Sequence, residues 1–380
     1  MRQAWRGLAG LLAVGVVAAG GSAALASDGG GQGGRDNNGN RGNNALATTI
    51  FTMPAAPDGN PEGVAVDKRS GRFFVSRTGT GAIFVGTLGS PTLTQFIAGV
   101  RANPAPTDPP VATGLKVRNG LLYVAGASTG QIRVYTLANP MAPPAIFETG
   151  GGFINDLDVT KDGDVYATDS FTANIYKVDA AAVAAGGPPT AVTPISVAPE
   201  ITVDTSPGVF NLNGIIASRD GDELTVVQSN TGKLYRITFG DNRADDDHGD
   251  HHARAAQATI ARKIQEITVQ GGDGDVKGGD GLLVDRGRLL VVRGSTPDNA
   301  KGAVQAFKLS HHGTRARFES ETPDASFSGP STIARAGKRL LVVNASFTAG
   351  PTPEGNFTVT GLARNAVRHG GHGGGGHGGR

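Results

Sequence analysis

Residues with oxygen-bearing side chains recur at one position of a repeated pattern. Glu62, Asn155, Asn213 and Asp280 each stand at the start of a short apolar, β-rich run. Carboxylate and amide oxygens are the hard ligands that Ca²⁺ prefers, at distances of about 2.3–2.6 Å. If the fold brings these side chains to one point, they predict an all-oxygen site for a divalent cation, most simply calcium. Without a cation, Glu62 and Asp280 would repel each other and one pKa would rise.

The elements that must position these residues form a repeated unit. In the unit that starts at Asn213, residues 215–217 and 224–227 are two β-rich runs around an Asp220-Gly221 turn, and residues 233–239 are a third. Asp-Gly between two such runs is a strong hairpin signal, because Gly supplies the positive φ that the turn requires. Similar units start at Glu62, Gly114, Asn155, Asn213, Asp280 and Ser331. Six copies of a three- to four-stranded unit predict an all-β fold, a six-bladed β-propeller.

The propeller explains why residues far apart in the chain would meet. The innermost strand of each blade lines the central channel, so the residues that open these strands converge at one mouth. Residues 47–53, before the first unit, predict a further strand that joins the last blade and closes the ring. For each position taken singly there is an alternative, because Asn-Gly and Asp-Gly pairs often serve only a turn, with the side chain bonded to nearby backbone.

The N-terminal segment has the pattern of a secretory signal. Arg2 and Arg6 are basic, residues 8–19 are apolar and small, and Ala24-Leu25-Ala26 offers a cleavage site. We therefore expect the protein to be exported and to keep no membrane span after cleavage.

The expected domain limits follow from composition. Residues 1–26 are the signal peptide, 27–45 a disordered Gly/Asn-rich linker, 46–364 the propeller and 365–380 a disordered Gly/His-rich tail. Residues 241–254 form an insertion rich in Asp and His, which we interpret as a solvated loop rather than a metal site because it lacks a rigid supporting shell. We derive no role for this loop.

Composition excludes several classes of function. The 35 basic and 33 acidic residues give a net charge of +2, which implies neither a nucleic-acid nor a membrane-surface partner. The chain has no Cys, so disulfides and thiol catalysis are excluded. None of the eight His lies in a predicted blade strand, so a Ser-His-Asp triad at the axis is not expected.

Short motifs in a fixed order carry a resemblance to a known family. Pro61-Glu62-Gly63, Asn155-Asp156, Asn213-Gly214 and Asp280-Gly281-Leu282 occur in the order typical of the senescence marker protein/gluconolactonase/luciferin-regenerating enzyme-like family of six-bladed propellers. The resemblance implies that Glu62, Asn213 and Asp280 bind a divalent cation and that Asn155 contacts substrate. If the protein is a hydrolase, we expect Asp280 to serve also as the catalytic base.

Two functions from different classes remain open at this point. The first is a secreted, metal-dependent hydrolase of the lactonase or esterase type that acts on a small molecule at the channel mouth. The second is a non-catalytic extracellular binding propeller, with or without structural calcium, because the phrase at residues 61–67 equally resembles an NHL-type repeat. Phe153 stands where sugar-lactonase members of the family usually have Arg, which puts a sugar lactone in doubt. We expect a monomer in either case.

Overall fold

The computed structural model describes residues 47–54, 59–105, 108–186, 192–239, 261–294, 301–347, 350 and 355–368. The expected signal segment 1–26, the expected linker 27–45, the loop 241–254 and the tail from residue 369 lie outside them. The described chain is almost entirely β-structure, apart from the short helices α1 (Ala180–Ala185) and η2 (Ala366–Arg368). Within this part of the chain no helix is long and apolar enough to cross a bilayer.

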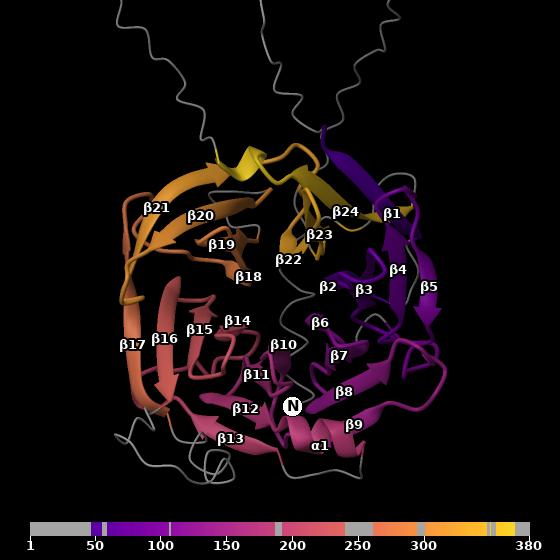
Figure 1. The fold of residues 1–380 in the computed structure, drawn as a ribbon, viewed down its shortest axis with the longest axis horizontal. Helices are drawn as coiled ribbons and strands as arrows, with labels where there is room; N and C mark the ends of the chain where they lie inside the picture. Colours follow the sequence, from indigo (N-terminus) through magenta and orange to yellow (C-terminus); the bar gives the residue numbers. More distant parts are fainter. Residues whose placement is uncertain are drawn as a thin grey trace, which may run out of the picture.

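Consecutive strands form antiparallel meanders arranged around a central axis, so the predicted all-β propeller is confirmed (Figure 1). The strands are β1 (Thr49–Pro54); β2 (Pro61–Val66), β3 (Arg72–Arg77), β4 (Ile83–Thr87), β5 (Thr94–Ile97); β6 (Leu115–Arg118), β7 (Leu121–Ala125), β8 (Gln131–Thr136), β9 (Ala145–Glu148); β10 (Ile154–Val159), β11 (Val165–Asp169), β12 (Asn174–Val178), β13 (Thr193–Ser196); β14 (Leu212–Ala217), β15 (Glu223–Gln228), β16 (Lys233–Phe239), β17 (Ala261–Gln270); β18 (Gly279–Asp285), β19 (Arg288–Arg293), β20 (Ala303–Leu309), β21 (Arg315–Thr322); and β22 (Pro330–Ala336), β23 (Arg339–Asn344), β24 (Asn356–Ala363).

The number of blades depends on how one large sheet is divided. Hydrogen bonding among the described residues gives four four-stranded sheets and one eight-stranded sheet. In the large sheet the outer strands β17 and β21 pair in parallel over residues 268–270 and 315–317. Division at this contact separates β14–β17 from β18–β21 and gives units of four strands throughout. We number these units 1 to 6 from β2, with β1 belonging to unit 6.

The first strand of the chain closes the ring. β1 pairs antiparallel with β24, in register from Thr49 opposite Gly361 to Pro54 opposite Asn356. The sequence predicted this strand at residues 47–53, and the structure places it at Thr49–Pro54. The outermost strand of unit 6 therefore comes from the opposite end of the chain to its three partners.

The apolar core is divided into clusters that lie between neighbouring units. Between units 3 and 4, for example, Tyr166 and Ile175 pack against Leu212, Ile215 and other buried side chains. Each strand contributes alternate side chains to the unit before it and the unit after it, because successive residues of a strand point to opposite faces. Burial of these alternating residues holds the units in a ring.

The propeller extends slightly further than the composition indicated. Residues 365–368 were expected to begin the disordered tail, but Ala366–Arg368 form the helix η2. Val367 is buried among Leu340, Leu362 and other residues of the cluster between units 5 and 6. A single apolar residue in a polar segment explains why composition alone missed this anchor.

Close approach of the innermost strands near the axis depends on glycine. A Cβ atom on Gly63 would lie 2.3 Å from the Thr113 carbonyl oxygen of unit 2. A Cβ on Gly214 would lie 2.1 Å from the Asp280 carbonyl oxygen of unit 5. Both contacts are with backbone, which cannot rotate away as a side chain can. These glycines are therefore required by the packing of strands rather than by turn geometry.

Substituting Gly214 by Ala should lower the free energy of unfolding by about 1–3 kcal/mol, because the inner strands β14 and β18 must separate to admit the methyl group. Chemical denaturation of the two proteins measures the difference. Gly89→Ala is the matched control, since a Cβ at Gly89 meets no atom within 4 Å. A Gly214→Ala protein as stable as the Gly89→Ala protein would show that the inner strands can move apart freely.

Candidate functional site

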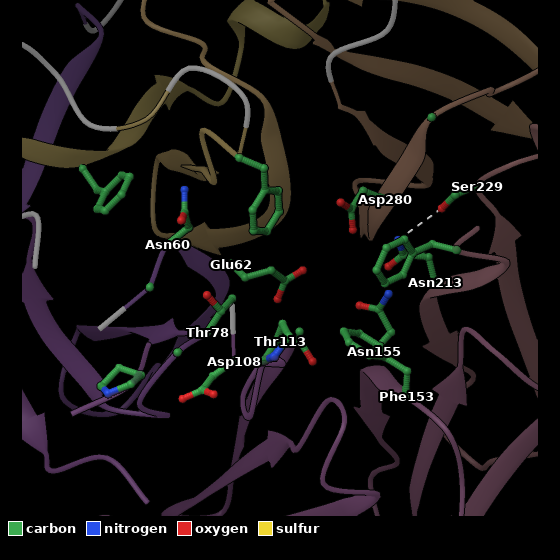
Figure 2. Close-up of a pocket in the computed structure, with 18 of the residues that line it drawn as sticks. Asn60, Glu62, Thr78, Asp108, Thr113, Phe153, Asn155, Asn213, Ser229 and Asp280 are labelled. Carbon is green, nitrogen blue, oxygen red and sulfur yellow. Dashed lines mark hydrogen bonds between the residues drawn. The ribbon is translucent and has the colours of Figure 1, made fainter. Parts of the chain in front are cut away.

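The four residues singled out in the sequence line one cavity. It has a volume of about 540 Å³ and lies at the end of the central channel where the inner strands begin. Glu62, Asn155, Asn213 and Asp280 come from units 1, 3, 4 and 5, and Figure 2 shows their side chains directed toward a common space. The predicted convergence of these residues is therefore seen in the structure.

A bulge near the start of the inner strand sets the direction of each of these side chains. Each site residue is the second residue of its strand, in β2, β10, β14 and β18. In all four units the pairing register between the inner strand and its neighbour shifts between the first and the fourth residue of the inner strand. The site residue and the residue after it lie within this irregular stretch. A β-bulge bends the strand and changes the direction of a side chain, which is why bulges are frequent beside functional sites. The alternative considered for each position, that the residue serves only a turn, does not describe these four residues.

The other two equivalent positions serve different purposes. Ser331 of unit 6 is buried, and its hydroxyl donates a 2.7 Å hydrogen bond to the Glu62 carbonyl oxygen. Gly114 of unit 2 has no side chain, and a Cβ there would lie 2.3 Å from Asp156 Oδ1. One position thus fixes the backbone of a site residue, and the other leaves room for a neighbouring carboxylate.

Two serine hydroxyls fix the orientation of the asparagine amides. Ser170 Oγ donates to the Leu212 carbonyl oxygen at 2.6 Å and accepts from Asn155 Nδ2 at 2.8 Å. Ser229 Oγ donates to the Gly279 carbonyl oxygen and accepts from Asn213 Nδ2 at 3.1 Å. A hydroxyl has one proton to donate, and here it donates that proton in the hydrogen bond to the carbonyl oxygen. The serine can therefore only accept a hydrogen bond from the asparagine, so each amide nitrogen must face the serine. The amide oxygen then lies on the opposite side of each asparagine from the serine.

Three buried oxygens of the site have no hydrogen-bond partner. They are Glu62 Oε2, Asn213 Oδ1 and Asp280 Oδ1. Buried polar atoms are nearly always hydrogen-bonded, so an unpaired one calls for an explanation such as a bound ion or water. The three atoms belong to the three residues for which the family resemblance implied metal binding.

Burial and neighbouring carboxylates raise the pKa values of Glu62 and Asp280. Burial, then the charges of Asp280 and Asp156, raise the pKa of Glu62 well above its usual value. Burial and the charge of Asp156 raise the pKa of Asp280 in the same direction, while a side-chain hydrogen bond from Asn213 opposes the change. Acidic side chains are therefore concentrated at the axis, and the charge of Asp280 raises the pKa of Glu62, as the pairing of these residues predicted.

Sequence reasoning missed Asp156 as a member of this group. Burial raises the pKa of Asp156 to about 6, although the charge of Lys116 opposes the shift. Asp156 occupies the position that Gly63, Gly214 and Gly281 hold in other units. A carboxylate in place of a repeated glycine was the available signal.

Aromatic residues on the cavity wall were also missed as site residues. Phe153 and Phe210 line the cavity and precede Asn155 and Asn213 by two and three residues. The described residues that line the cavity include no histidine, and His311 and His312 lie in the turn after β20.

The donor set fits a hard divalent cation. It offers two carboxylates and one amide oxygen, which are ligand types that Ca²⁺ accepts. Among the described residues no group of three or more His, Cys, Asp or Glu side chains is placed to hold a metal. A cation in this cavity would thus depend on the amide oxygen of Asn213 beside Glu62 and Asp280.

Neutralising a site carboxylate should stabilise the metal-free protein. With a raised pKa, the folded carboxyl keeps its proton at pH values where the unfolded chain has lost it, so the free energy of unfolding falls as pH rises above the ordinary carboxyl range. In EDTA at pH 7, Glu62→Gln should raise this free energy by about 1 kcal/mol or more. The gain should shrink toward pH 4, where both states are protonated.

Asp67→Asn provides a control of opposite sign. Although burial opposes it, hydrogen bonds from Ser70 and from backbone amides lower the pKa of Asp67. This substitution should therefore destabilise the protein at pH 7, with an effect that fades as pH falls through the lowered pKa of Asp67. Denaturation curves from pH 8 down to about pH 2 measure both effects, since the lowered pKa of Asp67 lies below the ordinary Asp value. A Glu62→Gln protein less stable than the unsubstituted one at every pH would contradict the electrostatic account.

Comparison with known proteins places the fold. The chain matches no family model and no curated protein sequence. It is similar to a gluconolactonase from Xanthomonas campestris, with 15% identity, a TM-score of 0.54 and coverage of 83% of this chain and 89% of that one. It is similar to a luciferin-regenerating enzyme at 12% identity, TM-score 0.53, covering 83% and 95%. A calcium-binding protein, regucalcin, from Agrobacterium tumefaciens gives 17% identity, TM-score 0.50, and 84% and 97%.

At these identities the similarity establishes the fold alone. The chain shares the all-β propeller fold of the senescence marker protein/gluconolactonase/luciferin-regenerating enzyme-like proteins.

Proposed function

We propose that this protein is a divalent-metal-dependent hydrolase of the lactonase or esterase type, acting in the cavity at the channel mouth. The observation that carries the proposal is the set of three buried, unpaired oxygens on Glu62, Asn213 and Asp280, which share one cavity. The cavity volume of about 540 Å³ is within the range of small-molecule sites. A site with buried carboxylates of raised pKa in a cleft is also typical of catalysis.

Glu62, Asn213 and Asp280 are the residues that would hold the cation, and Ca²⁺ suits their oxygens best. When bound, such a cation would polarise a substrate carbonyl as a Lewis acid. Ser229 keeps the Asn213 amide oxygen directed toward this position by accepting a hydrogen bond from the amide nitrogen.

Asp280 and Asn155 have separate roles in the proposed reaction. A water oxygen forms a bond to the carbonyl carbon while the Asp280 carboxylate takes a proton from that water. The bond from this carbon to the ring or ester oxygen then breaks, and the leaving oxygen takes the proton back from Asp280, which gives a hydroxy acid or an acid and an alcohol and regenerates the carboxylate. Burial suits Asp280 to this role, because a carboxylate of raised pKa is a stronger base. Asn155 uses its Nδ2 on Ser170, so its amide oxygen can accept a hydrogen bond from substrate.

Export remains part of the proposal. It rests on the basic residues Arg2 and Arg6, the apolar segment 8–19 and the Ala24-Leu25-Ala26 site. The substrate would then be a small extracellular molecule.

Cation binding is tested by thermal and chemical unfolding in EDTA and after addition of Ca²⁺. A site filled at one hundred times its dissociation constant should add about 2.7 kcal/mol to the free energy of unfolding. This gain should vanish in Glu62→Gln and Asp280→Asn. Asp108→Asn is the matched control, because Asp108 also lines the cavity but accepts a hydrogen bond from the Ala105 amide. Equal gains in all four proteins would place the cation elsewhere.

Catalysis is tested with a panel of lactones and esters in the presence of Ca²⁺. Asp280→Asn should lower kcat/KM by at least about 10²–10⁴, because it removes a general base and also a proposed cation ligand, while the far-UV circular dichroism stays unchanged. An Asp280→Asn enzyme with undiminished activity would end the assignment of Asp280. Calcium binding without hydrolysis of any member would favour the alternative, a non-catalytic binding propeller.

A further inference from the structure

The cavity has a polar end and an apolar wall. Site oxygens come from the bulges of the inner strands, whereas most of the wall comes from segments that precede or follow strands, and Phe357 comes from within β24. The apolar residues of the lining include Phe153, Phe210, Phe347, Phe357, Pro104 and Pro110. A ligand that fills this space must therefore present a polar group to one end and apolar surface to the wall.

Three aromatic rings make part of the wall rigid. The Phe153 ring centroid lies 5.1 Å from that of Phe210 and 5.2 Å from that of Phe171, and the latter two are 5.3 Å apart. Phe153 is buried, so its ring is held in place by packing. Rings in such mutual contact form a preorganised apolar surface rather than a flexible flap.

Phe347 extends the apolar surface to the rim. Its side chain is 59% exposed, yet it lines the cavity. Exposed large apolar side chains at a cleft are a feature of binding sites, because a ligand can remove their surface from water.

The charge of the lining disfavours an anion. The charged side chains that line the cavity in the described residues are Glu62, Asp108 and Asp280, all acidic. When all three carboxylates are ionised, their negative charge more than neutralises the positive charge of a bound divalent cation. A carboxylate or phosphate on the substrate would therefore meet no net attraction, and a neutral substrate is preferred.

We propose that the substrate is a neutral lactone or ester bearing an apolar alkyl or aryl substituent. This inference rests on the proposed function. The carbonyl lies at the polar end beside Glu62, Asn213 and Asp280, and the substituent lies along Phe153 and Phe210 toward Phe347. A polyhydroxylated lactone would have to leave its hydroxyls unpaired against this wall, which costs binding energy.

The test compares lactones that share one ring and differ in chain length. With the calcium-loaded enzyme, kcat/KM should rise at least about tenfold from γ-valerolactone through γ-octalactone to γ-decalactone, since a fully buried methylene contributes about fourfold. D-Glucono-δ-lactone should be a poorer substrate than γ-decalactone. In parallel, calorimetry should show that 5-hexyl-2-pyrrolidinone binds more tightly than 5-methyl-2-pyrrolidinone, because these lactams keep the ring carbonyl without being hydrolysed readily.

Two substitutions locate the apolar wall. Phe210→Ala and Phe347→Ala should each lower kcat/KM for γ-decalactone about tenfold while changing the value for γ-valerolactone little. Phe347→Ala should keep its thermal midpoint because the side chain is largely exposed. Val284→Ala is the control, since Val284 is 52% exposed on β18 but does not line the cavity.

The outcomes separate the two proposals. Lactam affinity that rises with chain length, together with no lactone hydrolysis, would refute the hydrolase and support the apolar site. Hydrolysis with no chain-length dependence, or with a preference for D-glucono-δ-lactone, would support the hydrolase and overturn the inference about substrate. Phenylalanine variants that affect short and long lactones equally would also overturn it.

Discussion

The close approach of backbones around the axis is the constraint on which the site depends. In units 1, 4 and 5 a glycine follows the site residue where the inner strands of neighbouring units meet, and a methyl group on Gly214 would lie 2.1 Å from the Asp280 carbonyl oxygen. This contact brings Asn213 and Asp280, which are far apart in the chain, into one cavity. The glycine that permits the packing and the polar residue that uses it are adjacent in sequence. Fold and site are therefore specified by the same dipeptides, and neither can change without the other.

The serines beside the asparagines join stability to orientation. Ser170 and Ser229 each donate to a carbonyl oxygen of the next unit and accept from an amide within their own unit. The same hydroxyl thus links two units and turns an amide oxygen away from itself. Placing Glu62, Asp156 and Asp280 close together costs stability. Burial raises the pKa of all three carboxyls, and the charge of Asp156 raises the pKa of Glu62 and Asp280 further. A protein selected only for stability would neutralise this cluster, and its persistence is consistent with a function at the axis.

Repetition made part of this structure predictable from sequence. The inner strands were recognised by their apolar runs and Asp-Gly or Asn-Gly turns, and the repeat then placed Glu62, Asn213 and Asp280 at one mouth. Apart from the strand predicted at residues 47–53, the outer strands were not recognised. Two of them, β5 (Thr94–Ile97) and β13 (Thr193–Ser196), are short and mostly exposed. Asp156 and Phe210 were missed for another reason. Their importance comes from side chains in other parts of the fold, and the only local sign was the carboxylate of Asp156 in place of the repeated glycine.

The pairing of β1 with β24 has a consequence for how the protein folds and how it can be rearranged. The last sheet cannot be completed until both ends of the propeller have been synthesised, so the ring closes through one of the most distant contacts in the chain. Contacts of such sequence separation slow folding, because chain entropy must be lost before they form. The same geometry places residues 49 and 361 side by side. The propeller is thus nearly a closed circle whose chain break falls inside one sheet, and a circular permutant that joined these ends would move the break without altering the axis.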